Sequence, residues 1–248
     1  TGAGSGIGAA IALRFASQGA QLVLNDLNRG NLELISAAVR DRGAAVAIAP
    51  GDVSRESVAR RLVEVAQDHF TSVDILVNNA GIAGSAAGDG PVTSSSLKSW
   101  HKVLQTNLDS VFLCCHYAIP AMIKAGGGSI VNLSSILALT GSAEFFTSHA
   151  YTASKGAIVS LTRALAAHYA DQKIRANVIC PGLIATPMTS RASSRKELMA
   201  YVAGKQRLLR GLGTPEGVAD AALFLASSES SLMTGVVLPV DGGWSAGY

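Results

Sequence analysis

The sequence is poor in aromatic residues and has no long hydrophobic run. Aromatic residues make up 5% of the chain, whereas 48% of its 248 residues are apolar and 26 are glycine. This apolar fraction allows a sizeable core and excludes a disordered chain, and the small residues favour close packing of helices on a sheet over a β-sandwich. No apolar run reaches the roughly 18 residues of a membrane span, and the first residues do not resemble a signal peptide. We therefore expect no membrane partner.

Cysteine and net charge are scarce as well. The three cysteines are an odd number without metal-ligand spacing, which favours a reducing, cytoplasmic location and predicts no metal site. The 20 basic and 17 acidic residues nearly balance, unlike the concentrated basic face of a nucleic-acid binder. One basic stretch lies at 191–210. We interpret it as the solvated face of a surface helix, with attraction of an anionic substrate as the alternative.

Strand and helix patterns alternate along the whole chain, which predicts a parallel sheet covered by helices on both faces. The expected strands lie at 21–26, 45–50, 74–79, 129–134, 174–181 and 236–240. The expected helices lie at 7–16, 31–42, 54–70, 150–170 and 215–227, with two more between 96 and 124 that Pro120 bends or breaks. The predicted fold is a single α/β domain over 1–248, a Rossmann-type doubly wound sheet of about seven strands.

The glycine-rich segment TGAGSGIG at 1–8 is typical of a turn between a buried strand and a helix. Nothing precedes it, so we expect the expressed protein to have roughly six to ten further N-terminal residues that supply the first strand. Glycine allows the tight turn and the close approach of a pyrophosphate, which makes this segment a candidate dinucleotide site. An ordinary strand-to-helix turn is the alternative. The candidate residues are Gly2, Ser5, Gly6, Ile7 and Gly8.

Asp26 ends the second expected strand, about twenty residues after the glycines, where an acid can bind the adenosine ribose. A carboxylate there repels a 2′-phosphate, so we expect NAD rather than NADP, although the nearby Arg29 could weaken that preference. A turn or helix cap is the other interpretation of Asp26. Asp52 and Val53 follow the third strand, and Asn79, Ala80 and Gly81 follow the fourth, also at the edge where such sheets bind ligands.

Tyr151 and Lys155 form the strongest chemical signal. On a helix, residues four apart share a face, so the phenol and the ammonium are neighbours. A nearby cation favours the ionised phenol and lowers its pKa towards the range of a general acid–base catalyst. By itself, the same spacing also occurs on solvated helix faces.

Taken together, the motifs resemble the short-chain dehydrogenase/reductase family. They are TGAGSGIG, Asp26, NNAG at 78–81, Asn107, VNLSS at 131–135, YTASK at 151–155, PG at 181–182 and VDGG at 240–243. Their order and spacing match over essentially the whole chain apart from the first strand. The resemblance implies an NAD(H)-dependent oxidoreductase that interconverts a small-molecule secondary alcohol and a ketone, assembled as a homotetramer or a dimer.

The resemblance also implies residue roles. Tyr151 would exchange the proton of the substrate oxygen, and Ser135 would orient that oxygen. Lys155 would bind the nicotinamide ribose and lower the pKa of Tyr151, and Asn107 would hold a water that links Lys155 to solvent. Asn79 would face the adjacent ribose, and Asp52 and Val53 would lie near the adenine. The nicotinamide end would be held by Pro181, Gly182, Ile184 and Thr186.

Three segments depart from the family pattern or remain open. The stretch between Ser135 and Tyr151 is longer than usual and contains an insertion at 144–149, whose His149 is a surface imidazole or, alternatively, a substrate contact. The Gly-, Ala- and Ser-rich loop at 83–96 is a flexible linker or a pocket wall. Residues 186–213 are expected to form a mobile substrate lid.

Two other functions remain as alternatives. A 3-oxoacyl-[acyl-carrier-protein] reductase shares this fold and catalytic set, but Asp26 opposes its usual NADPH preference. Gly127, Gly128 and Gln172 stand where its carrier-binding surface would have arginines. A non-catalytic dinucleotide-binding regulator would not need all four of the predicted catalytic residues. An enoyl reductase of the same family would show a wider Tyr–Lys spacing.

Overall fold

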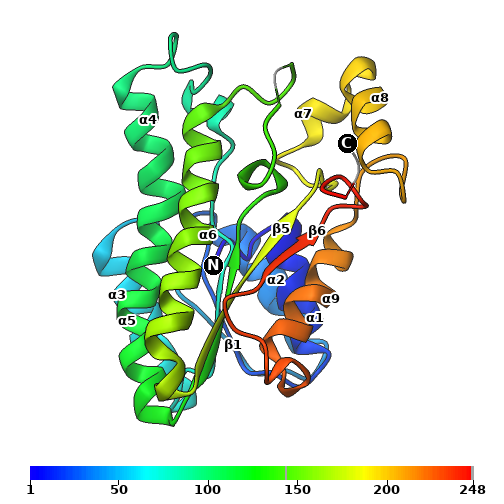
Figure 1. Cartoon of the computed structure of the whole chain (residues 1–248). Helices are drawn as coiled ribbons and strands as arrows, with labels where there is room; N and C mark the ends of the chain where they lie inside the picture. The colour runs from blue at the N-terminus through cyan, green and yellow to red at the C-terminus, as the bar shows by residue number, and fades with distance from the viewer. Residues whose placement is uncertain (143, 247–248) are drawn as a thin grey trace.

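The computed structural model describes residues 1–142 and 144–246, except for the side chains of residues 191 and 192. Within these residues, β1 (Leu22–Leu24) pairs with β2 (Val46–Ile48), and a second sheet has the order β3 (Ile75–Asn78), β4 (Gly128–Leu133), β5 (Ile174–Pro181) and β6 (Val237–Val240). Every pairing is parallel. Parallel neighbours require crossover connections, so the predicted α/β, Rossmann-type architecture is confirmed (Figure 1).

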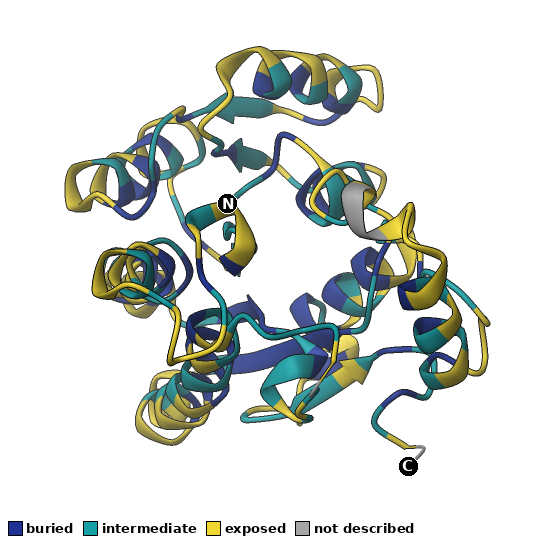
Figure 2. Ribbon diagram, turned by 90° about the horizontal axis from the view of Figure 1, so that it is seen from above, coloured by how far each residue is buried: buried dark blue, intermediate teal, exposed yellow. Residues whose placement is uncertain are grey.

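The parallel strands form two separate sheets, because β1 and β3 do not pair with each other. Between them lies a cavity of about 340 Å³, lined by Leu22, Leu24 and Val77 among others. The segment at 1–3 bridges the two sheets, through bonds that include Ala3 N–H to Asn25 O and Thr1 N–H to Val77 O, both 2.9 Å. Figure 2 shows the N-terminus in the space between the sheets.

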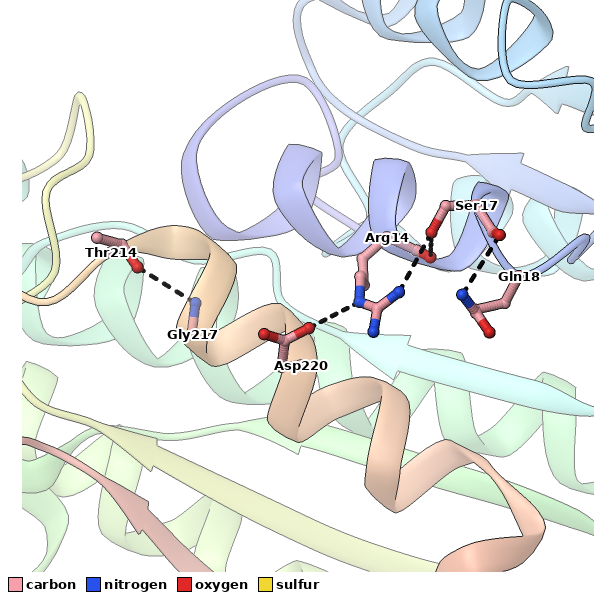
Figure 3. A network of polar contacts seen from close by, with 6 residues as sticks. All are labelled: Arg14, Ser17, Gln18, Thr214, Gly217 and Asp220. Atoms are coloured by element: carbon pink, nitrogen blue, oxygen red, sulfur yellow. Dashed lines mark hydrogen bonds and ion pairs between the residues drawn. The ribbon is translucent and has the colours of Figure 1, made fainter.

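Helices cover both faces of the larger sheet. α1 (Gly6–Ala16) and α9 (Pro215–Ala226) pack on one face through a cluster that includes Ile11, Phe15 and Leu225. An exposed ion pair, Arg14 Nε to Asp220 Oδ1 at 2.7 Å, joins these two helices at their surface (Figure 3). Exposed pairs of this kind contribute little, so the apolar cluster holds α1 and α9 together.

The other helices complete the layers. α3 (Glu56–Phe70), α5 (Ser110–Ala125) and α6 (His149–Tyr169) cover the opposite face through the largest apolar cluster. α2 (Arg29–Arg40) packs against α1 and the β1–β2 pair.

The predicted pair of helices between 96 and 124 is present, but the second helix is not broken at Pro120. α4 (Leu97–Leu104), a π-helical turn at Gln105–Asp109 and α5 follow one another without interruption, and α5 continues through Pro120 to Ala125. By length and composition alone, Leu97–Ala125 could cross a membrane. Core helices pass the same test, and here Cys114, Ala118 and Met122 are buried against the sheet and α3. This packing holds α5 together past the proline.

The segment at 186–213, which the sequence predicts to be a lid, contains α7 (Ser190–Ser193) and α8 (Lys196–Lys205). Its two ends are joined, since Ala185 N–H donates to Gly213 O and Gly213 N–H donates to Leu183 O, both at 2.9 Å. The buried Gln206 adds bonds to the Leu183 backbone and to Gly211 O. The two ends of the segment therefore lie next to each other, beside the carboxyl end of β5.

Candidate active site

Tyr151 and Lys155 lie in the first turns of α6, where the helical spacing places them on one face. The Nζ atom of Lys155 is 5.7 Å from the centre of the Tyr151 ring and donates to Leu133 O at the end of β4 (2.9 Å). Lys155 is 5% exposed. The lysine thus connects the helix that carries the phenol to the strand that precedes Ser135.

Ser135 lies two residues after the end of β4, and its side chain is hydrogen-bonded to the phenol. The cavity of about 510 Å³ at this edge is lined by both Ser135 and Tyr151. A hydrogen bond between the Ser135 hydroxyl and the phenol lowers the pKa of Tyr151, but burial raises it more, so the net shift is upward from its ordinary value. Burial also lowers the pKa of Lys155 to about 8.

The predicted lowering of the Tyr151 pKa by Lys155 is therefore wrong for this structure. The prediction considered only the charge of a neighbouring cation. Here the phenol is desolvated, and Lys155 is not among the groups that lower its pKa. The ammonium is itself desolvated and directs its hydrogen bond to Leu133 O rather than to the phenol.

Asn107 lies at the π-helical turn and is fully buried. Its Oδ1 accepts from Ile82 N–H (2.8 Å), and its Nδ2 donates to Ile82 O (3.1 Å) and to Ser154 Oγ (3.2 Å). Ser154 Oγ in turn donates to Tyr151 O (2.7 Å). A Cβ on Gly81 would lie 3.2 Å from Asn107 Oδ1 and 3.6 Å from Lys155 Nζ, so this glycine keeps the space beside both side chains open. The structure thus brings all four predicted catalytic residues to one edge of the sheet.

The glycine-rich turn lies at the same edge. Gly2 (φ +62°) and Gly6 (φ +53°) adopt left-handed conformations that side chains disfavour. A Cβ on Gly8 would collide with the carbonyl oxygen of Gly2, and one on Gly6 would lie 3.1 Å from Thr186 Cγ2. Asn79 Nδ2 donates to Gly2 O (3.1 Å) and fixes the turn against β3.

One further contact and the residue before α1 complete this region. Ala80 N–H donates to Thr1 Oγ1 (3.0 Å), and the exposed Ser5 precedes α1 without a side-chain cap bond of its own.

Asp26 lies beside this turn, as predicted from the spacing. Its Oδ2 accepts from Gly4 N–H and its Oδ1 from Asn28 N–H, both at 2.9 Å. Each carboxylate oxygen can accept a further hydrogen bond. Asp26 thus braces the turn and still offers acceptors to a ligand.

Asp52 and Val53, the two residues predicted to lie near the adenine, differ in which of their atoms a ligand could reach. Asp52 Oδ1 accepts from Ser54 N–H (3.0 Å) and Ser54 Oγ (2.6 Å). Burial opposes ionisation of Asp52, but the Ser54 bonds and the nearby Lys102 and Arg55 outweigh it, so its pKa is lowered. Val53 is buried in the core, so only its backbone remains available to a ligand.

The cavity beside Tyr151 has mostly apolar walls from three segments. The four predicted nicotinamide residues line it, together with Ile7 of α1. Phe145 and Phe146 come from the insertion, Met188 and Leu198 from the 186–213 segment, and Trp244 from the segment that follows β6. The insertion at 144–149 therefore forms part of the pocket wall.

The loop at 83–96 is also a pocket wall rather than a free linker. Ala83, Gly84, Ser85 and Asp89 line the cavity. His149 is not among the lining residues, because its Nδ1 accepts from Val92 N–H (3.0 Å) and its backbone N–H donates to Gly90 O (3.1 Å). The imidazole is exposed, as the interpretation of His149 as a surface side chain predicted, and its bond to Val92 attaches α6 to the loop.

Sequence reasoning missed Asp89. This carboxylate is 8% exposed and accepts from Tyr151 N–H (3.1 Å), Ala150 N–H (3.3 Å) and Ser95 Oγ (3.1 Å). It closes the N-terminal end of α6 at the residue that carries the phenol. Asp89 lies about sixty residues before α6 in the sequence. Its capping role could not be predicted, because sequence patterns identify an N-cap only next to the helix that it closes.

The fold and this edge define a nucleotide-binding α/β oxidoreductase site with a Tyr–Lys pair. The sequence matches the family model described as enoyl-(acyl carrier protein) reductase over residues 2–245. It is 39% identical over 246 residues to cis-4-hydroxycyclohexanecarboxylate dehydrogenase of Sinomonas cyclohexanicum, covering 99% of this chain and 95% of that protein.

Solved structures agree with the sequence comparison. Gluconate 5-dehydrogenase from Burkholderia cenocepacia J2315, in complex with NADP and tartrate, superposes with a TM-score of 0.92 at 31% identity, covering 100% of this chain and 94% of the other. 7α-Hydroxysteroid dehydrogenase, complexed with NADH and 7-oxo glycochenodeoxycholic acid, superposes with a TM-score of 0.90 at 32% identity, covering 98% and 91%.

The chain belongs to the short-chain dehydrogenase/reductase family. Like its relatives, it is an oxidoreductase that acts on a secondary alcohol or the corresponding ketone. The family binds a nicotinamide dinucleotide, and the neighbouring structures include complexes with NADP and with NADH. In the described part of the chain, no three His, Cys, Asp or Glu side chains gather where they could hold a metal ion.

Proposed function

We propose that the chain oxidises a cyclic secondary alcohol to the ketone, or catalyses the reverse reaction, with NAD(H) as its cofactor. The observation that carries the proposal is the placement of the Tyr151 phenol and the Ser135 hydroxyl in one largely apolar cavity, with Lys155 behind them. A ring fits such a cavity, and the relative with 39% identity is a dehydrogenase of a hydroxylated cyclohexane ring.

The structure offers a cradle suited to the dinucleotide. The left-handed glycines, the missing Cβ at Gly8 and the N-terminal end of α1 form a concave site for a pyrophosphate. Asp26 favours NAD, because its free acceptor capacity suits ribose hydroxyls and its charge repels a 2′-phosphate. A dinucleotide held by these residues would supply the hydride acceptor for oxidation of the alcohol and the hydride donor for reduction of the ketone.

The chain's own residues handle the proton. Ser135 would donate a hydrogen bond to the substrate oxygen, and the Tyr151 oxygen would accept the alcohol proton or return it to the ketone. Lys155 would bind the ribose beside the phenol. The Asn107 amide is occupied by Ile82 and Ser154, so the backbone of the π-helical turn, rather than the amide itself, would hold a water between Lys155 and solvent.

We also propose that the 186–213 segment closes as a lid over the bound substrate and excludes water, since its two ends meet at one hinge. A cytoplasmic location and a homotetramer, or a dimer, complete the proposal. Sedimentation of the purified protein tests the assembly, and a monomer would contradict it.

The experiment that tests the proposed function measures nicotinamide reduction by the protein with a panel of cyclic and open-chain secondary alcohols. NAD and NADP are compared in parallel, with Asp26→Asn as a variant that keeps the shape and loses the charge. We expect turnover with NAD and a shift towards NADP in the variant. A strict NADP preference of the wild type, with turnover of a 3-oxoacyl thioester, would instead support the acyl-carrier reductase.

A further inference from the structure

We propose that the substrate of this cavity carries a carboxylate group and that Arg195 binds it. The inference deepens the proposed function and rests on it, because it concerns the same cavity. By this inference, Arg195 makes the enzyme prefer alcohols that carry a carboxylate over neutral alcohols.

Charge is sparse in the cavity walls. Among the described residues that line it, only Asp89 and Arg195 are charged. Asp89 is buried, and both of its oxygens accept hydrogen bonds from α6 or Ser95. Arg195 is the exposed residue that precedes α8, and within the described part of the chain it forms no ion pair with an acidic side chain. Its guanidinium is therefore available to a ligand.

The guanidinium also has a defined place. Its Cζ lies 5.8 Å from the centre of the Phe145 ring, a cation–π arrangement. Phe145 packs on Tyr201 (5.1 Å between ring centres), and Tyr201 packs edge-on to Trp244 (5.8 Å). Since Trp244 is 3% exposed, this aromatic stack anchors the position of Arg195 to the core of the site.

A planar guanidinium with several fixed donors matches a carboxylate, which it can bind with two parallel hydrogen bonds. The Tyr151 phenol and the Ser135 hydroxyl line the same cavity as Arg195. Under the proposed function, these two groups bind the hydroxyl-bearing carbon of the substrate. The ring between that carbon and the carboxylate would contact the apolar walls. A hydroxylated alicyclic acid has all three parts, whereas a neutral ring alcohol leaves Arg195 without a partner.

The test compares a hydroxycyclohexanecarboxylate with its uncharged carboxamide as substrates of wild type, Arg195→Ala and Arg207→Ala. Arg207 is a matched control, because it is an exposed arginine two residues past the other end of α8 and does not line the cavity. For Arg195→Ala we expect kcat/KM for the acid to fall about tenfold, mainly through KM, with little change for the carboxamide. Arg207→Ala should leave both values unchanged.

A second measurement does not depend on turnover. Cyclohexanecarboxylate, which lacks the hydroxyl, is titrated against the fluorescence of Trp244 in a Trp100→Phe background, with cyclohexanecarboxamide as the neutral comparison. We expect tighter binding of the acid, lost in Arg195→Ala. Equal affinity for acid and amide, or equal losses in the two arginine variants, would overturn the inference even if alcohols are oxidised. Selective binding of the acid without oxidation of any alcohol would instead contradict the proposed function alone.

Discussion

Asp89 closes the N-terminal end of α6, and its replacement tests whether this contact positions the phenol. Asp89→Ala removes the acceptor of the Ala150 and Tyr151 N–H groups and leaves both in a buried turn. Loss of a helix N-cap costs about 0.5–2 kcal/mol, and an unsatisfied buried donor costs about 1–3 kcal/mol. These costs describe overlapping contacts, so we expect the free energy of unfolding to fall by about 2 kcal/mol, or roughly 4–8 °C in Tm for a chain of this length.

The kinetic consequence separates positioning from stability. Tyr151 lies in the first turn of α6, so fraying there displaces the phenol while the glycine-rich turn and Asp26 stay in place. At a temperature where the variant is folded, we expect kcat to fall about tenfold, with KM for NAD nearly unchanged. Asp89→Asn keeps one acceptor oxygen and should recover part of both losses.

The assay combines thermal unfolding with steady-state alcohol oxidation. Asp171→Ala serves as the control, since this exposed acid lies at the other end of α6, away from the cavity. If Asp89→Ala unfolds at the wild-type temperature and keeps the wild-type kcat, the carboxylate neither caps the helix nor positions the phenol. A loss of Tm with unchanged kcat would leave Asp89 a structural role only.

Three other predictions follow from the site. Burial lowers the pKa of Lys155 to about 8, so the charge that would bind the nicotinamide ribose is lost as the pH rises through that value, and KM for NAD should rise over the same range. A KM for NAD that stays constant through this range would contradict the role of Lys155. Gly8→Ala should weaken NAD binding and lower Tm, because its methyl group meets the Gly2 carbonyl; wild-type NAD affinity by titration would refute the cradle. Gln206→Leu should lower the free energy of unfolding by about 2–4 kcal/mol and speed proteolysis within 186–213, since the bonds to Leu183 and Gly211 are lost; an unchanged cleavage rate would show that Gln206 does not hold the lid.

Local patterns predicted most of the fold. The strand expected at 174–181 has the bounds of β5, and α6 starts and ends within one residue of the prediction. These elements depend on apolar periodicity within a short window, and the motifs at their carboxyl ends follow from the parallel topology. The roles of Ser135 and Asn107 beside Tyr151 and Lys155 were predicted from the family resemblance, because Asn107, Tyr151 and Lys155 lie on helices and not at strand ends.

Features that depend on distant contacts could not be predicted in this way. Pro120 predicted a bend or break, but burial of the surrounding apolar side chains keeps α5 continuous. The upward shift in the pKa of Tyr151 depends on burial by the whole fold, which the spacing to Lys155 does not encode. The contact between Asp89 and α6 joins segments about sixty residues apart and has no local signature.

The central claim is that the Tyr151 phenol exchanges the proton of the substrate oxygen. The most direct test measures NAD affinity and alcohol turnover in the same preparations of wild type and Tyr151→Phe, which differ by one buried hydroxyl. We expect NAD affinity within a few-fold of wild type and a loss of kcat of about 10²–10⁴-fold. Turnover by Tyr151→Phe at a rate near that of the wild type, with NAD bound normally, would contradict the claim.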